Sequence, residues 1–286
     1  MPSQQSKDRQ VTVYRSQTRL AKTPLDAIDE LVRELWRHRW HVSIKYKNTF
    51  KSRFNQTAFG IIWQFIEPLL PISAYALLAY IAVFPTRDDM PALVYIAIGL
   101  TLWMLMTDLV TRQMAALQSN AAILNKTRYP LAAVLAEAFA QSAFETVVRI
   151  LAGCVIFGLL IGAPPWQAVI VLPMLIPPLL LALGAGMIFS VLNSVYRDVE
   201  NIIQIIFRYG FFLSLTIFPL PSHPIVDRLL AFNPFAVYID AIRNAVVFGA
   251  PPHALTFGIW TVLAVAIFIG GCNLIYVMEP RLKGFL

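Results

Sequence analysis

The sequence predicts an all-α membrane protein with six transmembrane helices, and three observations lead to this fold class. Hydrophobic residues make up 58% of the 286 residues and charged residues only 14%, which a soluble globular domain does not show. Six apolar segments have about the 20 residues that a helix needs to cross a bilayer. The whole net charge of +7 lies in residues 1–53, before the first of these segments. The expected partner of this charge is therefore an anionic membrane surface and not a nucleic acid.

The region before the apolar segments divides into two parts. Residues 1–22 are polar and lack periodicity, which predicts a flexible cytoplasmic arm. No apolar core follows a short basic start, so no cleavable signal peptide is expected. Residues 23–55 predict a cytoplasmic amphipathic helix and a connector: Thr23 suits the N-cap, and Trp36 and Trp40 would lie among lipid headgroups. A soluble helix packed on a partner is the alternative interpretation.

Residues 56–286 form the predicted transmembrane domain. Its six apolar segments run from Ala58 to Phe84, Pro91 to Leu109, Leu131 to Gly162, Ala168 to Leu192, Ile202 to Leu220 and Leu255 to Val277. Eighteen Lys and Arg residues fall in the arm and connections on one side of these segments, and three fall on the other. By the positive-inside rule, this asymmetry predicts a multi-pass membrane protein with both termini in the cytoplasm.

Two connections carry structure of their own. The stretch from Arg112 to Pro130 is long enough for a short cytoplasmic helix. The stretch from Pro219 to Pro252 is apolar but too short to span the bilayer twice. It predicts two short reentrant helices on the outer side, which meet at Asn233-Pro234 and form a gate there.

Charged residues inside apolar segments are costly, at roughly 2.5 to 3.5 kcal/mol each, and need a reason. The third segment carries four polar residues spaced by four along one ridge: Glu137, Gln141, Glu145 and Arg149. One interpretation is a structural ion pair between Glu145 and Arg149 that fixes helix packing. The other is that the ridge lines a polar path or contacts a charged headgroup. For Asp108 and Arg208 the same two interpretations apply, a structural role or a place in a polar path.

Aromatic residues gather along the first and fifth segments, among them Trp63, Tyr75, Phe211 and Phe212. Most such residues in membrane helices face lipid or the protein core. A sharper hypothesis is that these four line a conduit for sugars, because the faces of pyranose rings stack on aromatic side chains.

The sequence lacks the patterns of several catalytic sites. It contains no Gly-x-x-x-x-Gly-Lys-Ser/Thr phosphate loop, no His-Glu-x-x-His and no Gly-x-Ser-x-Gly. The four histidines are scattered, and Cys154 and Cys272 lie inside apolar runs, so neither a metal site nor a disulfide is expected. We expect a transport protein that takes its energy from another subunit.

Several short patterns occur in order along the chain. They are Arg53 with Gly60, Trp63 and Glu67-Pro68; Asn125 to Pro130; Tyr196-Arg197-Asp198; Phe218-Pro219-Leu220; Asn233-Pro234; and the tail from Glu279 to Leu286. In order and spacing they resemble the permease subunits of ABC-2 type polysaccharide exporters, which move O-antigen, capsule or teichoic acid. The resemblance covers the chain from about residue 30. The long arm and the proline-rich fourth segment depart from a typical member, which leaves the substrate subclass open.

The resemblance implies two copies of the chain, each paired with a separate nucleotide-binding ATPase subunit that holds ATP and Mg²⁺, and a lipid-linked polysaccharide as cargo. The polar and aromatic patterns described above supply the candidates for the substrate path: Trp63, Tyr75, Glu145, Arg149, Arg208, Phe211 and Phe212. The resemblance places the chain in the inner membrane. Contacts that couple the chain to the ATPase fall on Asn125, Lys126, Arg128, Arg197 and Asp198. A basic collar of Lys45, Lys47, Lys51 and Arg53 would attract the pyrophosphate of the cargo lipid, with Lys47, Lys51 and Arg53 as the headgroup-binding candidates. Anchoring of the chain by its positive charge alone is the alternative interpretation of this collar.

Other functions compete with this interpretation. An ion-coupled carrier would use Glu145, Arg149 and Arg208 as its charged path. The same exporter fold can also move another lipid or a drug. A membrane-bound enzyme that modifies glycans is a further alternative, but the sequence offers no catalytic constellation for it.

Overall fold

The structure is a computed structural model that describes residues 23–54, 62–81, 87, 89–126, 129–160, 169–221, 223–249 and 253–282. The described part of the chain is helical and contains no strand. The predicted arm of residues 1–22, the beginning of the first apolar segment, the outer turn at 163–167 and residues 283–286 of the tail lie outside these ranges.

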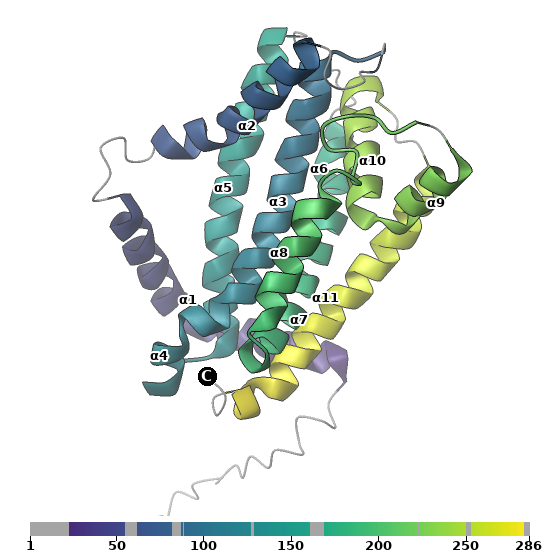
Figure 1. Ribbon diagram of the computed structural model, residues 1–286. Helices are drawn as coiled ribbons and strands as arrows, with labels where there is room; N and C mark the ends of the chain where they lie inside the picture. Colours follow the sequence, from purple (N-terminus) through teal and green to yellow (C-terminus); the bar gives the residue numbers. More distant parts are fainter. Residues whose placement is uncertain are drawn as a thin grey trace, which may run out of the picture.

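Four long helices form the body of the molecule (Figure 1): α3 (Ala92–Ser119), α5 (Leu131–Leu160), α7 (Ile176–Val195) and α11 (Ala254–Leu282). They pack in the order α5, α3, α7, α11, each against the next. Among the described residues, the stretches long and apolar enough to cross a membrane belong to these helices: Ala92–Lys126, Leu131–Leu151, Val171–Val195 and Ala254–Leu282. The predicted second, third, fourth and sixth segments are thus confirmed as long apolar helices.

Two glycines let α7 and α11 approach closely. A Cβ atom on Gly184 would lie 2.6 Å from the Cα of Phe268, and one on Gly271 would lie 2.8 Å from the carbonyl oxygen of Gly184. Small residues at such crossings are typical of helix pairs in membranes, where backbone contact replaces the hydrophobic effect as the source of attraction. The α7–α11 contact therefore depends on the absence of side chains at these two positions.

The second segment extends further than the sequence predicts. α3 continues to Ser119, beyond the predicted end at Leu109, because Gln113, Met114 and Leu117 are buried and keep the helix packed on its neighbours. The short α4 (Ala121–Lys126) follows, as expected for a short helix between Arg112 and Pro130. In the fourth segment, the prolines coincide with a break between α6 (Val171–Met174) and α7.

The first and fifth segments differ most from the prediction. α2 (Trp63–Tyr80) has 18 residues and packs on α3 and α5. α8 (Asp198–Gly210) has only 13 residues, so it is about 20 Å long, whereas the hydrocarbon core measures about 30 Å. The chain leaves the helix within the predicted fifth segment: Ser214 Oγ donates to the Gly210 carbonyl at 2.7 Å, and Leu215 has a φ of 53°. Neither α2 nor α8 is among the four spanning helices, and the six-span topology stays a prediction.

α1 (Pro24–Phe54) confirms that this region is a helix, and its position in the membrane interface stays a prediction. The Thr23 hydroxyl accepts from the Asp26 backbone N–H at 3.3 Å and donates to the Asp26 carboxylate at 2.6 Å, so Thr23 caps the first turn as expected. The helix lies across one end of the bundle and contacts both α11 and α5 (Figure 1). Trp36 and Trp40 remain 69% and 68% exposed, as their predicted position among lipid headgroups requires.

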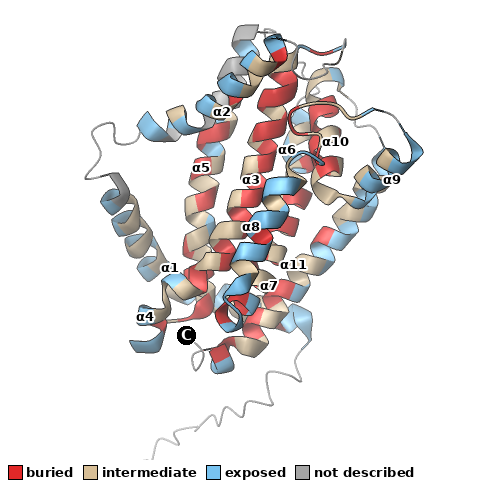
Figure 2. Ribbon diagram, in the orientation of Figure 1, coloured by how far each residue is buried: buried red, intermediate tan, exposed pale blue. Residues whose placement is uncertain are grey.

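At the opposite end of the bundle, α9 (Pro224–Phe232) and α10 (Pro234–Phe248) meet at Asn233-Pro234. The two short helices and their turn are therefore confirmed, and their reentrant position in a bilayer stays a prediction. Figure 2 shows that buried residues concentrate along α3 and α10, whereas most of α8 and α9 is exposed. We refer below to the α1 end and the α10 end of the bundle.

Candidate functional site

The charged ridge of α5 is tied into the bundle by ion pairs with α3. Arg112 Nη2 donates to Glu145 Oε2 at 2.5 Å, and Arg149 lies 3.7 Å from the same carboxylate oxygen. Arg149 also pairs with Asp108 on α3. Glu145 and Arg149 are only 5% and 7% exposed, so their charges are compensated inside the protein. This geometry favours the structural interpretation of the pair, and it enlarges the pair into a network of four residues.

The first residue of the ridge, Glu137, fastens α1 to α5. Lys45 Nζ lies 2.7 Å from Glu137 Oε2, and Thr49 Oγ1 donates to Glu137 Oε1 at 3.0 Å. Lys45 also donates to the Asn120 side chain at 2.5 Å, which links α1 to the end of α3. Because Glu137 is 4% exposed, α1 is held by a nearly buried carboxylate and not by a surface ion pair. We call Lys45, Thr49 and Glu137 the α1 latch.

The second attachment of α1 is made by its first half. Tyr276 Oη on α11 donates to Glu30 Oε2 at 2.6 Å, and Ile28 and Leu31 pack against a cluster that includes Leu282. α1 therefore bridges α5 and α11 across the end of the bundle. A displacement of α1 would act on both outer members of the row of long helices.

Of the lysines near the end of α1, Lys45 belongs to the α1 latch, and the two predicted headgroup contacts Lys47 and Lys51 do not. Lys47 and Lys51 are exposed on α1, whereas Lys45, which precedes them, turns inward to Glu137. The side chain of Arg53 lies outside the described residues. Two cations thus face outward at the α1 end, free of the packing that fixes Lys45.

The predicted coupling residues share one end of the molecule. Asn125 and Lys126 are exposed on α4, and Arg197 and Asp198 are exposed where α7 turns into α8. Figure 1 shows both connections at the α1 end. Arg128 lies outside the described residues. The structure therefore presents polar side chains from two separate connections on the same end as α1.

α8 has three distinct faces. Ile203, Val199 and Phe207 pack inward on the core. A second face is apolar and exposed, with Ile202, Ile206 and Tyr209 each more than half exposed. Between them runs a ridge of polar residues that are exposed or half-buried: Glu200, Asn201, Gln204 and Arg208.

The predicted path residues are divided between the core and the surface. Trp63 and Phe212 are 44% and 46% exposed, whereas Phe211 packs against Trp103 and Tyr75, with ring centroids 5.7 Å apart in both cases. Arg208 is exposed on α8, whereas Glu145 and Arg149 are buried and pair with residues of α3. The use of these three charged residues as one path for an ion stays a prediction.

At the α10 end, Asn233 links the beginning of α10 to the turn that follows α8. Its side-chain oxygen accepts from the backbone N–H groups of Phe235 and Ala236 at 3.1 and 3.4 Å and caps α10. Its side-chain nitrogen donates to Ser214 Oγ at 2.9 Å. Pro234 provides the first residue of α10. The predicted gate residues therefore hold α10 against the turn that follows α8.

Arg243 is the most important residue that the sequence interpretation missed. It is fully buried on α10, and its Nη2 donates to the Leu215 carbonyl oxygen at 2.6 Å. Its guanidinium carbon lies 3.6 Å from the ring centroid of Tyr95 on α3. In the sequence, Arg243 is one of the three Lys and Arg residues on the less basic side of the apolar segments. Its position between apolar residues, from Ala241 to Val247, is the signal for its burial.

A surface ion pair lies in the connection that precedes α3. Arg87 Nε and Nη2 donate to the two carboxylate oxygens of Asp89 at 2.8 and 2.6 Å. These hydrogen bonds lower the pKa of the Asp89 carboxyl below its usual value, because they stabilise its charged form. Asp89 is therefore engaged locally at the α10 end of the bundle.

Comparisons with known proteins identify relatives of this chain. The chain is 25% identical over 210 residues to the O-antigen export system permease protein RfbA of Myxococcus xanthus, which covers 71% of this chain and 79% of that protein. It is 23% identical over 241 residues to the polysialic acid transport protein KpsM of Escherichia coli, covering 80% and 90% of the two chains. The family of ABC-2 type transporters matches residues 41–247, which is more than half of the chain. The protein therefore belongs to the ABC-2 type transporter family.

Proposed function

We propose that this chain is the permease subunit of an ATP-driven exporter that moves a lipid-linked polysaccharide across the inner membrane. Two copies would pair with two nucleotide-binding ATPase subunits on the cytoplasmic side. The termini and the α1 end would face the cytoplasm, as the distribution of Lys and Arg predicts. ATP and Mg²⁺ would bind to the ATPase subunit, because the chain has no phosphate-binding loop of its own.

One observation carries the coupling part of the proposal. The α1 end exposes Asn125, Lys126, Arg197 and Asp198 from two connections, and α1 is latched beside them to α5 and α11. A partner that pushes on this end would move α1 and the two connections together. The exposed Lys47 and Lys51 would attract the anionic headgroup of the cargo lipid to the same end.

The polar ridge of α8 supports a path formed with a second copy. A ridge with the half-buried Glu200 and the exposed Gln204 and Arg208 is unfavourable against lipid, because hydrocarbon does not solvate such groups. A second copy placed over α8 would enclose this ridge and leave the apolar face to lipid. Trp63 and Phe212 would then contribute exposed aromatic surface on which sugar rings can stack.

The function predicts a specific defect in cells that lack the chain. We expect lipid-linked glycan to accumulate inside these cells and surface glycan to disappear, with both restored by the wild-type gene. Affinity purification of the tagged chain should recover an ATPase subunit, and the purified chain alone should not hydrolyse ATP. Unchanged surface glycan, or ATP hydrolysis by the isolated chain, would contradict the proposal.

The α1 latch predicts a separation of ATP hydrolysis from export. We expect Lys45→Met to lower exported glycan per ATP hydrolysed by about fivefold, because α1 would no longer pull on α5 through Glu137. Membrane levels of the chain and co-purification of the ATPase should persist. Arg37→Met, which removes an exposed cation from the same helix, is the matched control and should leave the ratio unchanged. Equal ratios in the two variants would show that the latch does not couple.

A further inference from the structure

A cavity of about 380 Å³ lies at the α10 end, beside the turn that follows α8. It is lined by Leu215, Asp227, Leu230, Ala231, Ala236, Val237, Asp240, His253 and Thr256. These residues come from that turn, from α9 and α10, and from the beginning of α11. Its volume lies within the range of roughly 300 to 1,000 Å³ that small-molecule sites occupy. None of the candidate site residues discussed above lines it.

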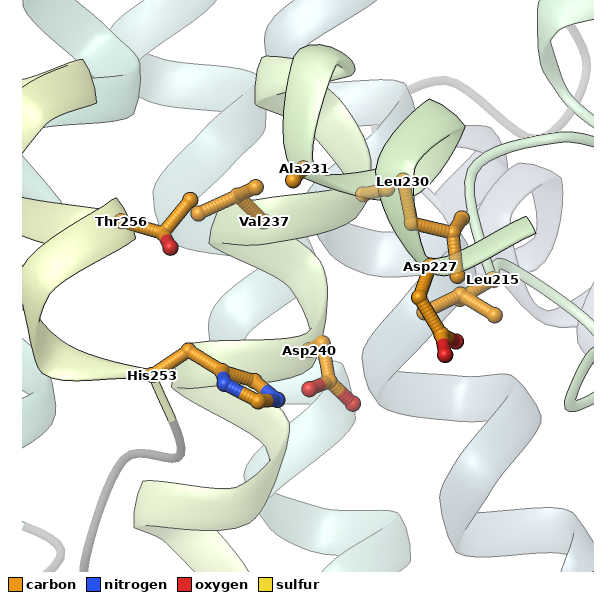
Figure 3. A pocket seen from close by; sticks show the side chains of 9 residues that line it. Leu215, Asp227, Leu230, Ala231, Val237, Asp240, His253 and Thr256 are labelled. Atoms are coloured by element: carbon orange, nitrogen blue, oxygen red, sulfur yellow. The ribbon is translucent and has the colours of Figure 1, made fainter. Parts of the chain in front are cut away.

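Three polar side chains, Asp227, Asp240 and His253, lie near one another in the cavity. Figure 3 shows the ring of His253 pointing toward the Asp240 carboxylate, with the Asp227 carboxylate on the far side of Asp240. Among the described residues, neither aspartate forms an ion pair, and Asp240 accepts a hydrogen bond from Asn244 at 3.0 Å. Both carboxylates therefore keep acceptor capacity for a ligand. Leu230 and Val237 supply apolar wall beside them.

The backbone of the cavity is held in an unusual conformation. Among the described non-glycine residues, a left-handed φ occurs at Leu215 and His253, with values of 53° and 54°, and both residues line this cavity. Such conformations persist where surrounding contacts enforce them, and they cluster at binding sites. The buried Arg243 enforces the first of them, because it donates to the Leu215 carbonyl oxygen at 2.6 Å. One wall of the cavity, at Leu215, is thus tied to the core through Arg243.

We propose that this cavity binds one sugar unit of the leaving glycan, and that the unit carries hydroxyl or ammonium donors and no carboxylate. Two acceptor carboxylates suit hydroxyl and ammonium groups, and the apolar wall suits the C–H face of a pyranose. A uronic or sialic acid would bring a like charge to Asp227 and Asp240 and would be repelled. Arg87 and Arg243 interact electrostatically with Asp240 and weaken this repulsion, but neither lines the cavity to pair with a carboxylate of the sugar. No group of three His, Cys, Asp or Glu residues among the described residues is arranged to hold a metal ion that would reverse this preference.

This inference rests on the proposed function for its cargo, but its test requires neither ATP nor export. The full chain in lipid nanodiscs is titrated by calorimetry, in EDTA, with three trisaccharides: chitosan trisaccharide, maltotriose and trigalacturonate. We expect the amino sugar to bind at least about fivefold more tightly than trigalacturonate, with maltotriose in between. The double variant Asp227→Asn/Asp240→Asn should remove the preference for the amino sugar and still bind maltotriose.

Two further variants keep the test specific. Ala231→Trp fills the cavity and should abolish binding of all three trisaccharides, whereas Asp29→Asn removes an exposed carboxylate on α1 and should leave the affinities unchanged. No binding, equal affinities or tighter binding of trigalacturonate would overturn the inference. If surface glycan depends on the chain while binding fails, only this inference falls. If binding follows the expected order while export is absent, the proposed function falls instead.

Discussion

Replacing Gly99 with alanine is expected to destabilise the protein by about 3 kcal/mol, because the added methyl group has no space. A Cβ atom at Gly99 would lie 2.0 Å from the Thr216 carbonyl oxygen and 2.4 Å from Arg243 Nη2. The Thr216 oxygen belongs to a backbone turn that Arg243 and Asn233 hold from two sides, so it cannot move aside without breaking their hydrogen bonds. We expect the midpoint of thermal unfolding, followed by tryptophan fluorescence in nanodiscs, to fall by roughly 6 to 12 °C.

Gly258→Ala is the matched control for this substitution. Gly258 lies on α11, and no heavy atom would lie within 4 Å of a Cβ atom placed there. Alanine favours a helix over glycine by about 1 kcal/mol, so this variant should keep the wild-type midpoint or raise it slightly. If Gly99→Ala also keeps the wild-type midpoint, then α3 does not pack on the turn at 215–216 as closely as the structure shows.

The sequence predicted the features that depend on local pattern. Thr23 followed by Pro24 and Asp26 marks the beginning of α1, and the structure confirms this cap. The spacing of four between Glu137, Gln141, Glu145 and Arg149 predicts one ridge on α5, and helical geometry alone ensures it. Asn233-Pro234 likewise marks the boundary of α10, because a capping side chain followed by proline is a local signal.

The sequence did not predict which residues meet across the bundle. It paired Glu145 with Arg149, but the structure gives Glu145 a second partner, Arg112, and gives Arg149 the carboxylate of Asp108. Both added partners lie on α3. Which residues of α3 face α5 depends on the packing of the whole bundle. Periodicity defines the faces of each helix but not the register between two helices, so this network could not be derived from one sequence.

The end of α8 shows a second feature that the sequence alone could not predict. The run from Phe211 to Leu220 is apolar, and hydropathy cannot distinguish an apolar helix from an apolar turn that is buried in protein. The turn persists because its carbonyl oxygens are satisfied from outside, by Arg243 at Leu215 and by Asn233 at Leu213. Both donors lie on the α9–α10 region, later in the chain. Two long-range hydrogen bonds therefore stabilise the turn that follows the helical part of the fifth segment.

Replacing Arg149 with leucine is expected to cost about 1 to 3 kcal/mol, because it leaves Asp108, whose side chain is 36% exposed, without its partner and weakens the compensation of the buried Glu145. The double variant Asp108→Leu/Arg149→Leu removes both charges and keeps the Arg112–Glu145 pair, so it should recover more than half of this loss. Arg33→Leu is the control. Arg33 pairs with Asp29 one turn away, their side chains are 75% and 57% exposed, and such a surface pair contributes about 0 to 1 kcal/mol.

All variants are compared by chemical unfolding in the same detergent. A double variant as unstable as Arg149→Leu would mean that packing volume, and not unpaired charge, causes the loss. A stable Arg149→Leu would mean that water or lipid headgroups solvate this network, and the polar-path interpretation of the α5 ridge would then be favoured.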